Sequence, residues 1–502
     1  MDSSLIDEHQ PLLGRDLERH ASVASHSHLN GIVDFHADGD SDNPVEWPAA
    51  FKWAIVGLLA LMAFTVTFTC ISVVPVASRI ANDLSHGNST KSASVLLVTI
   101  WELGEAGGPL LIAPLSEVFG RYPVMNAANV LFIAATIMAA LSQSTPLFIA
   151  ARALTGLSVA SNVLSPAIVG DMFIPEQRGS PMSLIMLAPL LGGAIGPAIA
   201  GGIAQSLGWR QVIWMSSVLA STCGILIFCC FKETYKVPIL RKRAAKLRRQ
   251  SGDLSLKTAF DVNEESDLRK LWDSIRRPAA VFFGSSVLLL LALFGSISFT
   301  YFYVLAVTLP DILQSKYGLS PALTGSTFLS FSVGSAISVG ICNLTLDRIY
   351  IKLRDSDKSD NSITAKGKPE FRLPLVIFGA FTLPFAIALY GWTAELRLPL
   401  PLLILSISLI GFTLILAFVP LMAYVVDAFG VYSASALTAI IVSRCLMSTF
   451  LPLLTAPLTD SLGYGKGFTV LCGLSLALAP IPVIVMKFGS RLRQRSEFSR
   501  DE

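Results

Sequence analysis

Two carboxylates inside an apolar stretch are the residues whose type and spacing most clearly permit chemistry. Glu102 and Glu105 interrupt the apolar segment 93–115. Because residues three apart share one face of an α-helix, both carboxyl groups should point the same way. Two carboxylates held so close in a medium of low dielectric constant should not both be ionised. We therefore interpret them as candidates for carrying protons. The alternatives are a pair with a neighbouring helix or contact with a cationic substrate.

The composition places this stretch in a membrane. Of the 502 residues 53% are hydrophobic and only 15% are charged, and the mean hydropathy is +0.62. In a soluble protein of this length about a quarter of all residues would be charged. Acidic groups within a membrane are costly and mark functional sites. The net charge of +3 gives no reason to expect a nucleic-acid partner.

Apolar segments long enough to cross a bilayer occur twelve times. A backbone inside lipid must satisfy its own hydrogen bonds, so each segment should be a helix, and we expect an all-α membrane protein. The segments are 53–75, 93–115, 124–143, 147–170, 181–204, 210–231, 279–308, 321–342, 373–392, 399–425, 433–459 and 467–487.

Charged connectors divide the chain and orient it. The connector 232–278 carries thirteen Lys and Arg residues, whereas alternate connectors such as 205–209 are short and nearly uncharged. The positive-inside rule then puts both termini and this basic loop in the cytoplasm. We interpret the loop as a linker that touches anionic lipid headgroups, in preference to a regulatory site. The predicted units are a disordered tail 1–50, a six-helix bundle 51–231, the loop 232–278, a second bundle 279–487 and a tail 488–502.

Short motifs add predictions about modification and location. Asn88 opens an N-glycosylation sequon in the first outside loop, whereas the sequon at Asn343 falls on the cytoplasmic side and should stay unmodified. Glu8, Leu12 and Leu13 fit an acidic dileucine sorting signal. We expect the plasma membrane as the location, with a vacuolar or endosomal membrane as the alternative. The seven cysteines show no metal or disulfide spacing.

A charged turn follows the second segment and has partial counterparts elsewhere. Glu117, Gly120 and Arg121 lie in this turn, and Asp347 with Arg348 follows the eighth segment in the same way. Asp171 and Asp427 end the fourth and tenth segments and most simply anchor loops. Features at matching places suggest two related six-helix units. Glu117 and Arg121 can pair with each other or cap a helix end.

Three longer motifs resemble the major facilitator superfamily, and within it the fungal drug:proton antiporters with twelve spans. They are Asn43-Pro44-Val45-Glu46-Trp47, the run from Gly107 to Arg121, and the run Asp427 to Ala436 followed by Arg444. The resemblance covers roughly residues 43 to 487. It implies two pseudo-symmetric bundles and a cytoplasmic gate at Glu117, Gly120 and Arg121, for which the alternative is a topological anchor.

The resemblance also gives a role to an arginine in the fourth segment. Arg152 matches the family's Arg-x-x-x-Gly feature, whose arginine is implicated in proton transfer. A buried guanidinium stays charged and needs a partner, and Glu102 or Glu105 is the candidate that we expect. The alternative is a structural ion pair.

The fifth segment resembles the signature of antiporters in this superfamily. Its small residues allow close helix approach, and the proline removes one backbone hydrogen bond. Together with the resemblance to the family, this signature predicts that the protein exports its substrate. The residues concerned are Gly192, Gly196, Pro197 and Gly201.

Candidates for the substrate cavity come from the second half of the chain. Arg444 lies within the eleventh segment without an evident acidic partner in sequence, and could attract an anionic substrate. Tyr301 and Tyr303 belong to an aromatic run that could line a cavity for a ring-bearing compound, although such runs more often serve packing.

Together these features predict a proton-coupled efflux transporter. It would export a small organic compound, such as a drug, a toxin or a fungal secondary metabolite, by alternating access. No phosphate-binding loop or nucleophile constellation is evident, so we expect neither an enzyme nor a cofactor, and the proton gradient as the energy source. Its partners would be the substrate and the lipid bilayer, and we expect a monomer. The alternatives are a proton-coupled nutrient importer and a non-transporting sensor of the same fold.

Overall fold

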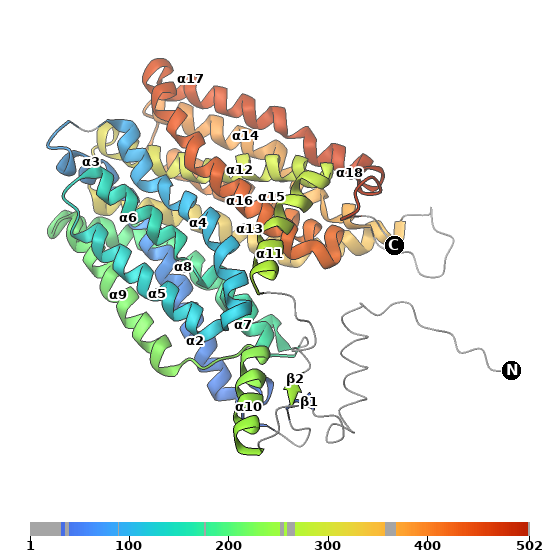
Figure 1. Ribbon diagram of the computed structural model, residues 1–502. Coiled ribbons are helices and arrows are strands. Elements are labelled where there is room, and N and C mark those ends of the chain that lie inside the picture. The colour runs from blue at the N-terminus through green and yellow to red at the C-terminus, as the bar shows by residue number, and fades with distance from the viewer. Residues whose placement is uncertain are drawn as a thin grey trace.

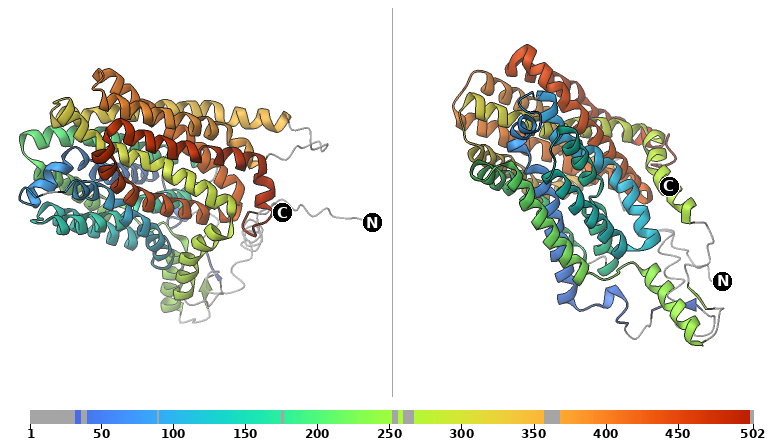
Figure 2. Two further views of the ribbon diagram at one scale, coloured as in Figure 1. Left: turned by 90° about the horizontal axis from the view of Figure 1, so that it is seen from above. Right: turned by 60° about the vertical axis from the view of Figure 1, so that its left-hand side comes forward.

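The computed structural model describes residues 32–35, 40–88, 90–174, 177–251, 256–258, 267–356 and 368–499. The dileucine motif at Glu8 lies outside the described residues. Two groups of helices lie side by side, one from each half of the chain, blue to green and yellow to red in Figures 1 and 2.

The first group, here called the N-half, is made of helices from the described residues between 49 and 230. They are α2 (Ala49–Ile71), η2 (Val74–Val76), α3 (Ala77–Leu84), α4 (Lys91–Phe119), α5 (Arg121–Ala140), α6 (Thr145–Leu157), α7 (Ser161–Met172), α8 (Gly179–Ser206) and α9 (Trp209–Cys230).

The second group, the C-half, follows a connector made of α10 (Lys236–Ser251), β2 (Lys257–Thr258) and α11 (Asp267–Gly284). Its elements are α12 (Ser286–Asp311), the π-helix η4 (Ile312–Lys316), α13 (Pro321–Ser356), η5 (Pro369–Arg372), α14 (Pro374–Glu395), α15 (Leu400–Phe429), η6 (Gly430–Tyr432), α16 (Ser433–Phe450), η7 (Leu451–Leu454), α17 (Thr455–Leu478) and α18 (Pro480–Arg493).

The predicted twelve spans are confirmed once one long helical stretch is divided. Eleven stretches in the described residues are long and apolar enough to cross a membrane, and the last runs over 61 residues, 433–493. An unbroken helix of that length would be about 90 Å long, three times the thickness of a bilayer core. Gly463, with φ +78° and ψ 173°, breaks it within α17. The stretch therefore supplies two spans.

Two boundaries differ from the prediction. The seventh span begins at Ser286, because Ser285 is extended and its hydroxyl accepts a bond from the Leu288 amide at 3.5 Å. The predicted start at residue 279 falls inside α11, which is a separate helix. The fourth span is interrupted between α6 and α7, where the chain turns over residues 158–160.

The predicted N-terminal tail also differs over its described residues. β1 (Ile32–Val33) pairs in parallel with β2, and Asp40 forms an ion pair with Arg243 of α10. Pro44–Glu46 forms η1 directly before α2. These residues are therefore bound to the central connector instead of forming a structureless tail up to residue 50.

Two ends of the molecule are named here by their elements. The α10 face carries α10, η5 and the end of α18, and was predicted to be cytoplasmic; the α3 face carries α3 and the bend at Gly463 (Figure 1). The halves are closely packed near the α3 face. A Cβ atom at Gly201 would lie 2.2 Å from the Pro321 carbonyl oxygen, and one at Gly325 would lie 1.9 Å from that of Pro197.

The glycine-rich helix α8 thus packs in two directions. Gly192 faces α2, and a Cβ atom on Gly192 would lie 2.7 Å from the Phe64 carbonyl oxygen. Gly196 lies against Phe68, which also belongs to α2. Gly201 faces α13 of the other half. The helix continues through Pro189 and Pro197 without ending. Small residues here let backbones meet, as the sequence predicted.

Candidate functional site

The two predicted carboxylates meet an arginine of the other half at the centre of the molecule. The Nη2 atom of Arg444, on α16, lies 3.4 Å from Oε1 of Glu105 and 3.8 Å from Oε2 of Glu102, both on α4. Only 2% of the Glu102 side chain is exposed, against 13% for Glu105 and 14% for Arg444. Two carboxylates and one guanidinium leave one surplus negative charge if all are ionised. The cluster can therefore take up one proton or one cationic group.

Neutral donors hold the carboxylates in place. The Tyr303 hydroxyl, on α12 of the other half, donates to Glu102 Oε1 at 2.6 Å. Glu105 accepts from the Trp101 indole at 3.2 Å and from the Asn162 amide of α7 at 3.0 Å. Sequence reasoning missed Asn162 because an asparagine in a span carries no motif. Bonds of this kind fix the orientation of a carboxylate.

Arg152 has different partners from those predicted. Its guanidinium donates to three backbone carbonyls, those of Thr69 at 3.0 Å, Cys70 at 2.8 Å and Leu97 at 3.3 Å. It also lies 4.7 Å from the centroid of the Trp101 ring. The carbonyls of Thr69 and Cys70 belong to the last turn of α2, which ends at Ile71. A cation there satisfies carbonyls that the helix leaves free. The expected pair with Glu102 or Glu105 is not among its described contacts.

A cavity of about 360 Å³ borders the charge cluster and lies between the halves. Glu102, Glu105, Arg444 and Tyr303 line it together with four phenylalanines. Arg444 also lies 4.4 Å from the centroid of the Phe299 ring. The four aromatic rings come from α12 and α13 and belong to Phe299, Phe302, Phe328 and Phe331.

Of the two predicted cavity tyrosines, only Tyr303 lies at the cavity. Tyr301 points into the C-half, where its hydroxyl donates to the Leu471 carbonyl of α17 at 2.8 Å. Two residues along an α-helix rotate the side chain by about 200°, so Tyr301 and Tyr303 face opposite sides of α12. The prediction for Tyr301 was therefore wrong.

Two polar atoms at this cavity make no hydrogen bond within the described part of the chain. They are Nε of Arg444 and Oε2 of Glu102, and both are buried. Buried polar atoms of this kind can bond to a group that enters the cavity. Glu102, Glu105 and Cys445 also bring ligand atoms within 4.8 Å of one another. The Arg444 guanidinium beside them opposes a metal cation electrostatically, so we assign no metal.

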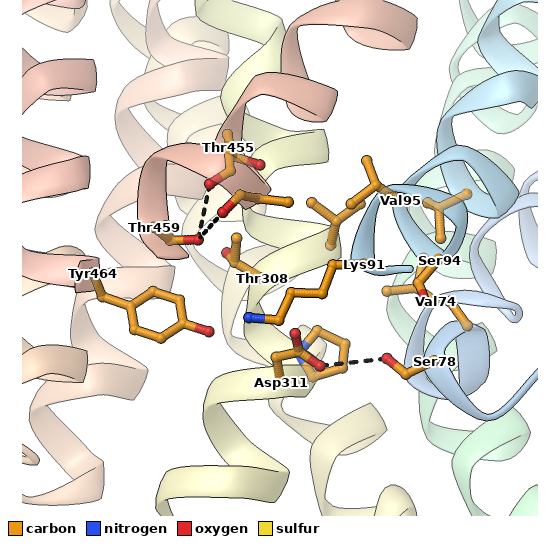
Figure 3. Close-up of a pocket in the computed structure, with 15 residues that line it drawn as sticks. Val74, Ser78, Lys91, Ser94, Val95, Thr308, Asp311, Thr455, Thr459 and Tyr464 are labelled. Atoms are coloured by element: carbon orange, nitrogen blue, oxygen red, sulfur yellow. Dashed lines mark hydrogen bonds between the residues drawn. The ribbon is translucent and has the colours of Figure 1, made fainter. Parts of the chain in front are cut away.

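A second, smaller cavity of about 170 Å³ lies nearer the α3 face (Figure 3). Lys91 and Asp311 point into it, and Ser78 donates to Asp311 at 3.4 Å. Lys91 also forms an ion pair with Asp460 of α17, which joins the two halves. Sequence reasoning missed these residues because they end apolar segments and match no motif.

The two cavities follow the same pair of helices and are one helical turn apart. On α4, Val98 lines the smaller cavity and lies four residues before Glu102 of the central cluster. On α12, Val307 lines the smaller cavity and lies four residues after Tyr303. Apolar side chains therefore separate the central charges from the polar cavity near the α3 face.

The predicted gate residues lie at the α10 face with new partners. Arg121 pairs with Asp171 at 3.3 Å and donates to Ser116 at 2.5 Å, whereas Glu117 is exposed. The expected pair of Glu117 with Arg121 is replaced by the contact between Arg121 and Asp171, both in the N-half.

Gly120 has a specific reason to be glycine. Its φ is +100°, and a Cβ atom there would lie 2.3 Å from a carboxylate oxygen of Glu233. Glu233 accepts from the amides of Arg121 and Tyr122 at 2.9 and 3.1 Å, and so caps the start of α5. Sequence reasoning missed Glu233 because it follows the sixth span, far from the turn in sequence.

The C-half repeats this arrangement. Arg372, just before α14, bonds to Asp427 at 2.9 Å and to Asp347 at 2.7 Å. Burial alone would lower the pKa of Arg372, but the bonds to Asp427 and Asp347 raise it above its ordinary value. The counterpart of Arg121 is thus Arg372. The sequence had suggested Arg348 instead. The related positions support the internal duplication.

Comparison with known proteins gives a consistent result. Residues 56–452 match the model of the family described as "Major Facilitator Superfamily". The chain is 30% identical to the efflux pump radE of Floropilus chiversii, over 93% of this chain and 86% of that protein. It is 32% identical to the MFS transporter cpaT of Aspergillus oryzae, over 92% of each. Among solved structures, the xylose transporter XylE from E. coli is similar, with a TM-score of 0.63 and 16% identity over 88% of this chain and 98% of that chain.

Proposed function

The chain belongs to the major facilitator superfamily, and from this premise we propose that it exports a small organic compound in exchange for protons. It is a multi-pass membrane transporter. The observation that carries the proposal is the central cluster of Glu102, Glu105 and Arg444. In this cluster the carboxylates lie on one half and the guanidinium on the other.

The coupling follows from the charge of the cluster. With both carboxylates ionised, Arg444 is attracted to α4, which holds the halves together at mid-membrane. A proton on either glutamate weakens this attraction and leaves the guanidinium with less compensation. A cationic substrate that displaces the proton would pair with the ionised carboxylate in its place, so the cluster holds either the proton or the substrate's charge. Proton and substrate then compete for one site, as exchange requires.

The cavity walls indicate the kind of substrate. Four phenylalanine rings provide an apolar surface, and the surplus negative charge favours a positively charged or hydrogen-bond-donating group. The Oε2 atom of Glu102, which makes no hydrogen bond within the described residues, can accept from such a group. We therefore propose a ring-bearing compound with a basic or donor group. The fungal relatives named above support efflux of an organic compound.

The orientation and location are part of the proposal. We propose that the α10 face is cytoplasmic and that the protein resides in the plasma membrane as a monomer. The thirteen basic residues in the connector 232–278 support this orientation. The proton gradient would supply the energy.

The test uses a host that lacks its own drug pumps. A panel of aromatic amines is first screened for compounds to which the host becomes resistant when it expresses this chain. The best compound is then followed into inside-out plasma-membrane vesicles with an acidic interior. Export predicts uptake that stops when the pH gradient is dissipated.

Variants of the cluster refine the test. Glu105→Gln, with Glu102→Gln tested separately, removes the surplus negative charge, so each variant should bind a basic compound more weakly and should lose uptake driven by the pH gradient. Normal pH-dependent uptake in both variants would remove the two glutamates from the mechanism. Accumulation in vesicles of the opposite polarity would indicate an importer, and binding without flux in either would indicate a sensor.

A further inference from the structure

A large groove at the α10 face has no role in the mechanism described above. Its volume is about 1150 Å³, and it lies between α10 and the adjacent ends of the N-half spans. We call it the α10 groove. Trp47, Tyr122 and Phe231 line one side, and basic residues of α10 line the other. Figure 2 shows α10 beyond the ends of the N-half helices.

Three cations of α10 share one face of the helix. Lys242, Lys246 and Arg249 are spaced at i, i+4 and i+7, all are exposed, and all line the groove. No acidic partner is recorded for any of them within the described ranges. A fourth cation, Lys232, also lines the groove and lies 5.5 Å from the Phe51 ring centroid.

The acidic groups near the groove do not neutralise this face. Asp40 is paired with Arg243, and Glu233 accepts from the amides of Arg121 and Tyr122. Among the described residues, the acids that line the groove are Asp42 and Glu233, and Glu233 keeps its charge because its donors are neutral amides. Two carboxylates against four cations leave the described lining of the groove with a net positive charge. Such a site attracts an anionic group with several oxygen acceptors.

The opposite side of the groove leads to the lipid-facing surface. The Tyr122 hydroxyl donates to the Phe228 carbonyl at 3.1 Å, and the two rings lie 6.4 Å apart. The Phe228 side chain is 61% exposed on α9, so an apolar surface begins where the polar groove ends. Aromatic rings at the end of a span lie at the level of the lipid headgroups. The groove thus joins a cationic wall to an apolar surface.

From this geometry we propose that the α10 groove binds one anionic phospholipid. The headgroup phosphate and carboxylate would lie against Lys242, Lys246 and Arg249, and an acyl chain would lie along Tyr122 and Phe228. A soluble anion would use the cationic wall alone and would gain nothing from the apolar surface. The continuity of the two surfaces therefore favours a lipid over a free phosphate compound.

The test is native mass spectrometry of the full-length protein in detergent, with phosphatidylserine or phosphatidylcholine added. Phosphatidylserine should bind as a discrete single adduct, and phosphatidylcholine should bind more weakly. The variant Lys242→Gln, Lys246→Gln, Arg249→Gln should bind phosphatidylserine roughly a hundredfold more weakly, because it loses three basic residues that each contribute about 1 kcal/mol near a membrane surface.

A matched control separates this site from general charge effects. Lys352, Lys487 and Arg491 are three exposed cations of the C-half, and their triple change to Gln removes the same charge. This control should bind phosphatidylserine as the wild type does. An equal loss in both variants, or equal binding of both lipids by the wild type, would overturn the proposal.

A further variant tests the choice of lipid over a soluble anion. Phe228→Ser changes an exposed residue and should weaken binding of phosphatidylserine but leave glycerophosphoserine unaffected. If glycerophosphoserine displaces phosphatidylserine at similar concentrations, and Phe228→Ser changes neither, the occupant is a free anion and the lipid assignment fails.

Discussion

Arg152, which is buried, and Arg444, which is partly buried, both lie in the interior of a span, and their surroundings differ in kind. Arg152 is held by three backbone carbonyls, all from the N-half, and by the Trp101 ring. Arg444 is held by two carboxylates of the opposite half and by the Phe299 ring. Both guanidiniums are therefore compensated, but only one of them by groups that can gain a proton.

This difference separates structure from coupling. Backbone carbonyls do not titrate in the physiological range, so the contacts of Arg152 do not depend on protonation. The contacts of Arg444 depend on the protonation of Glu102 and Glu105 and cross between the halves. We infer that Arg152 joins α6 to α2 and α4, whereas Arg444 can respond to protons.

The largest effect on folding should come from Arg152. In Arg152→Gln, three carbonyls lose a charged donor inside the N-half. We expect a destabilisation of about 3 kcal/mol or more, and a large loss of folded protein. Size-exclusion chromatography of a fluorescent fusion, with a thermal ramp, measures both quantities. Wild-type yield and thermal stability in this variant would break the distinction between the two arginines.

Replacing Arg444 should affect transport and spare folding. In Arg444→Gln, the glutamates lose their counter-charge but can be neutralised by protons, so the structural cost is smaller than at Arg152. We expect proton-driven flux to fall to the level of vesicles without the protein. Flux in vesicles is the readout, and the folded yield from the same preparation is the control. Retained coupling would exclude Arg444 from the mechanism.

Tyr303 and Tyr301 offer a smaller, matched pair of changes. Tyr303→Phe removes the donor to Glu102, and a hydrogen bond to a charged group contributes about 1.5 kcal/mol, so flux should fall by up to about tenfold. Tyr301→Phe removes a bond to a backbone carbonyl within the C-half and should change flux little. The pH dependence of flux should move only in Tyr303→Phe. The same change in both variants would show that the bond to Glu102 has no special part.

The smallest expected change tests the orientation of the chain in the membrane. This orientation decides on which side of the membrane the central cluster releases its proton. Asn88 is exposed at the turn before α4, on the α3 face, whereas Asn343 lies on α13 toward the α10 face. Asn88→Gln should abolish any shift on a gel that a glycosidase removes, and Asn343→Gln should leave it. A shift that depends on Asn343 would reverse the assignment of the two faces.

Much of the architecture follows from hydropathy. Twelve apolar segments can satisfy their backbones in lipid only as helices, and the structure has them. Boundaries depended on local features that hydropathy does not record, such as the Ser285 cap that starts α12. The ion pairs that Arg121 and Arg372 form at the α10 face were predicted only in part. Asp427 was identified as a helix end, but its partner Arg372 lies 55 residues away in another connector.

The central site was predicted in part and for a physical reason. Periodicity along α4 determined that Glu102 and Glu105 share a helix face, and apolar flanks determined that they are buried. The periodicity of α4 could not determine which arginine faces these two carboxylates. Arg152, predicted as the partner, turns to the last carbonyls of α2, where a cation compensates the helix end. Arg444 reaches Glu105 across 339 residues of chain. The sequence by itself determined which residues had to be compensated. Only the packing of one half on the other decided which residues compensate them, because a helix's own period fixes its faces but not its neighbours.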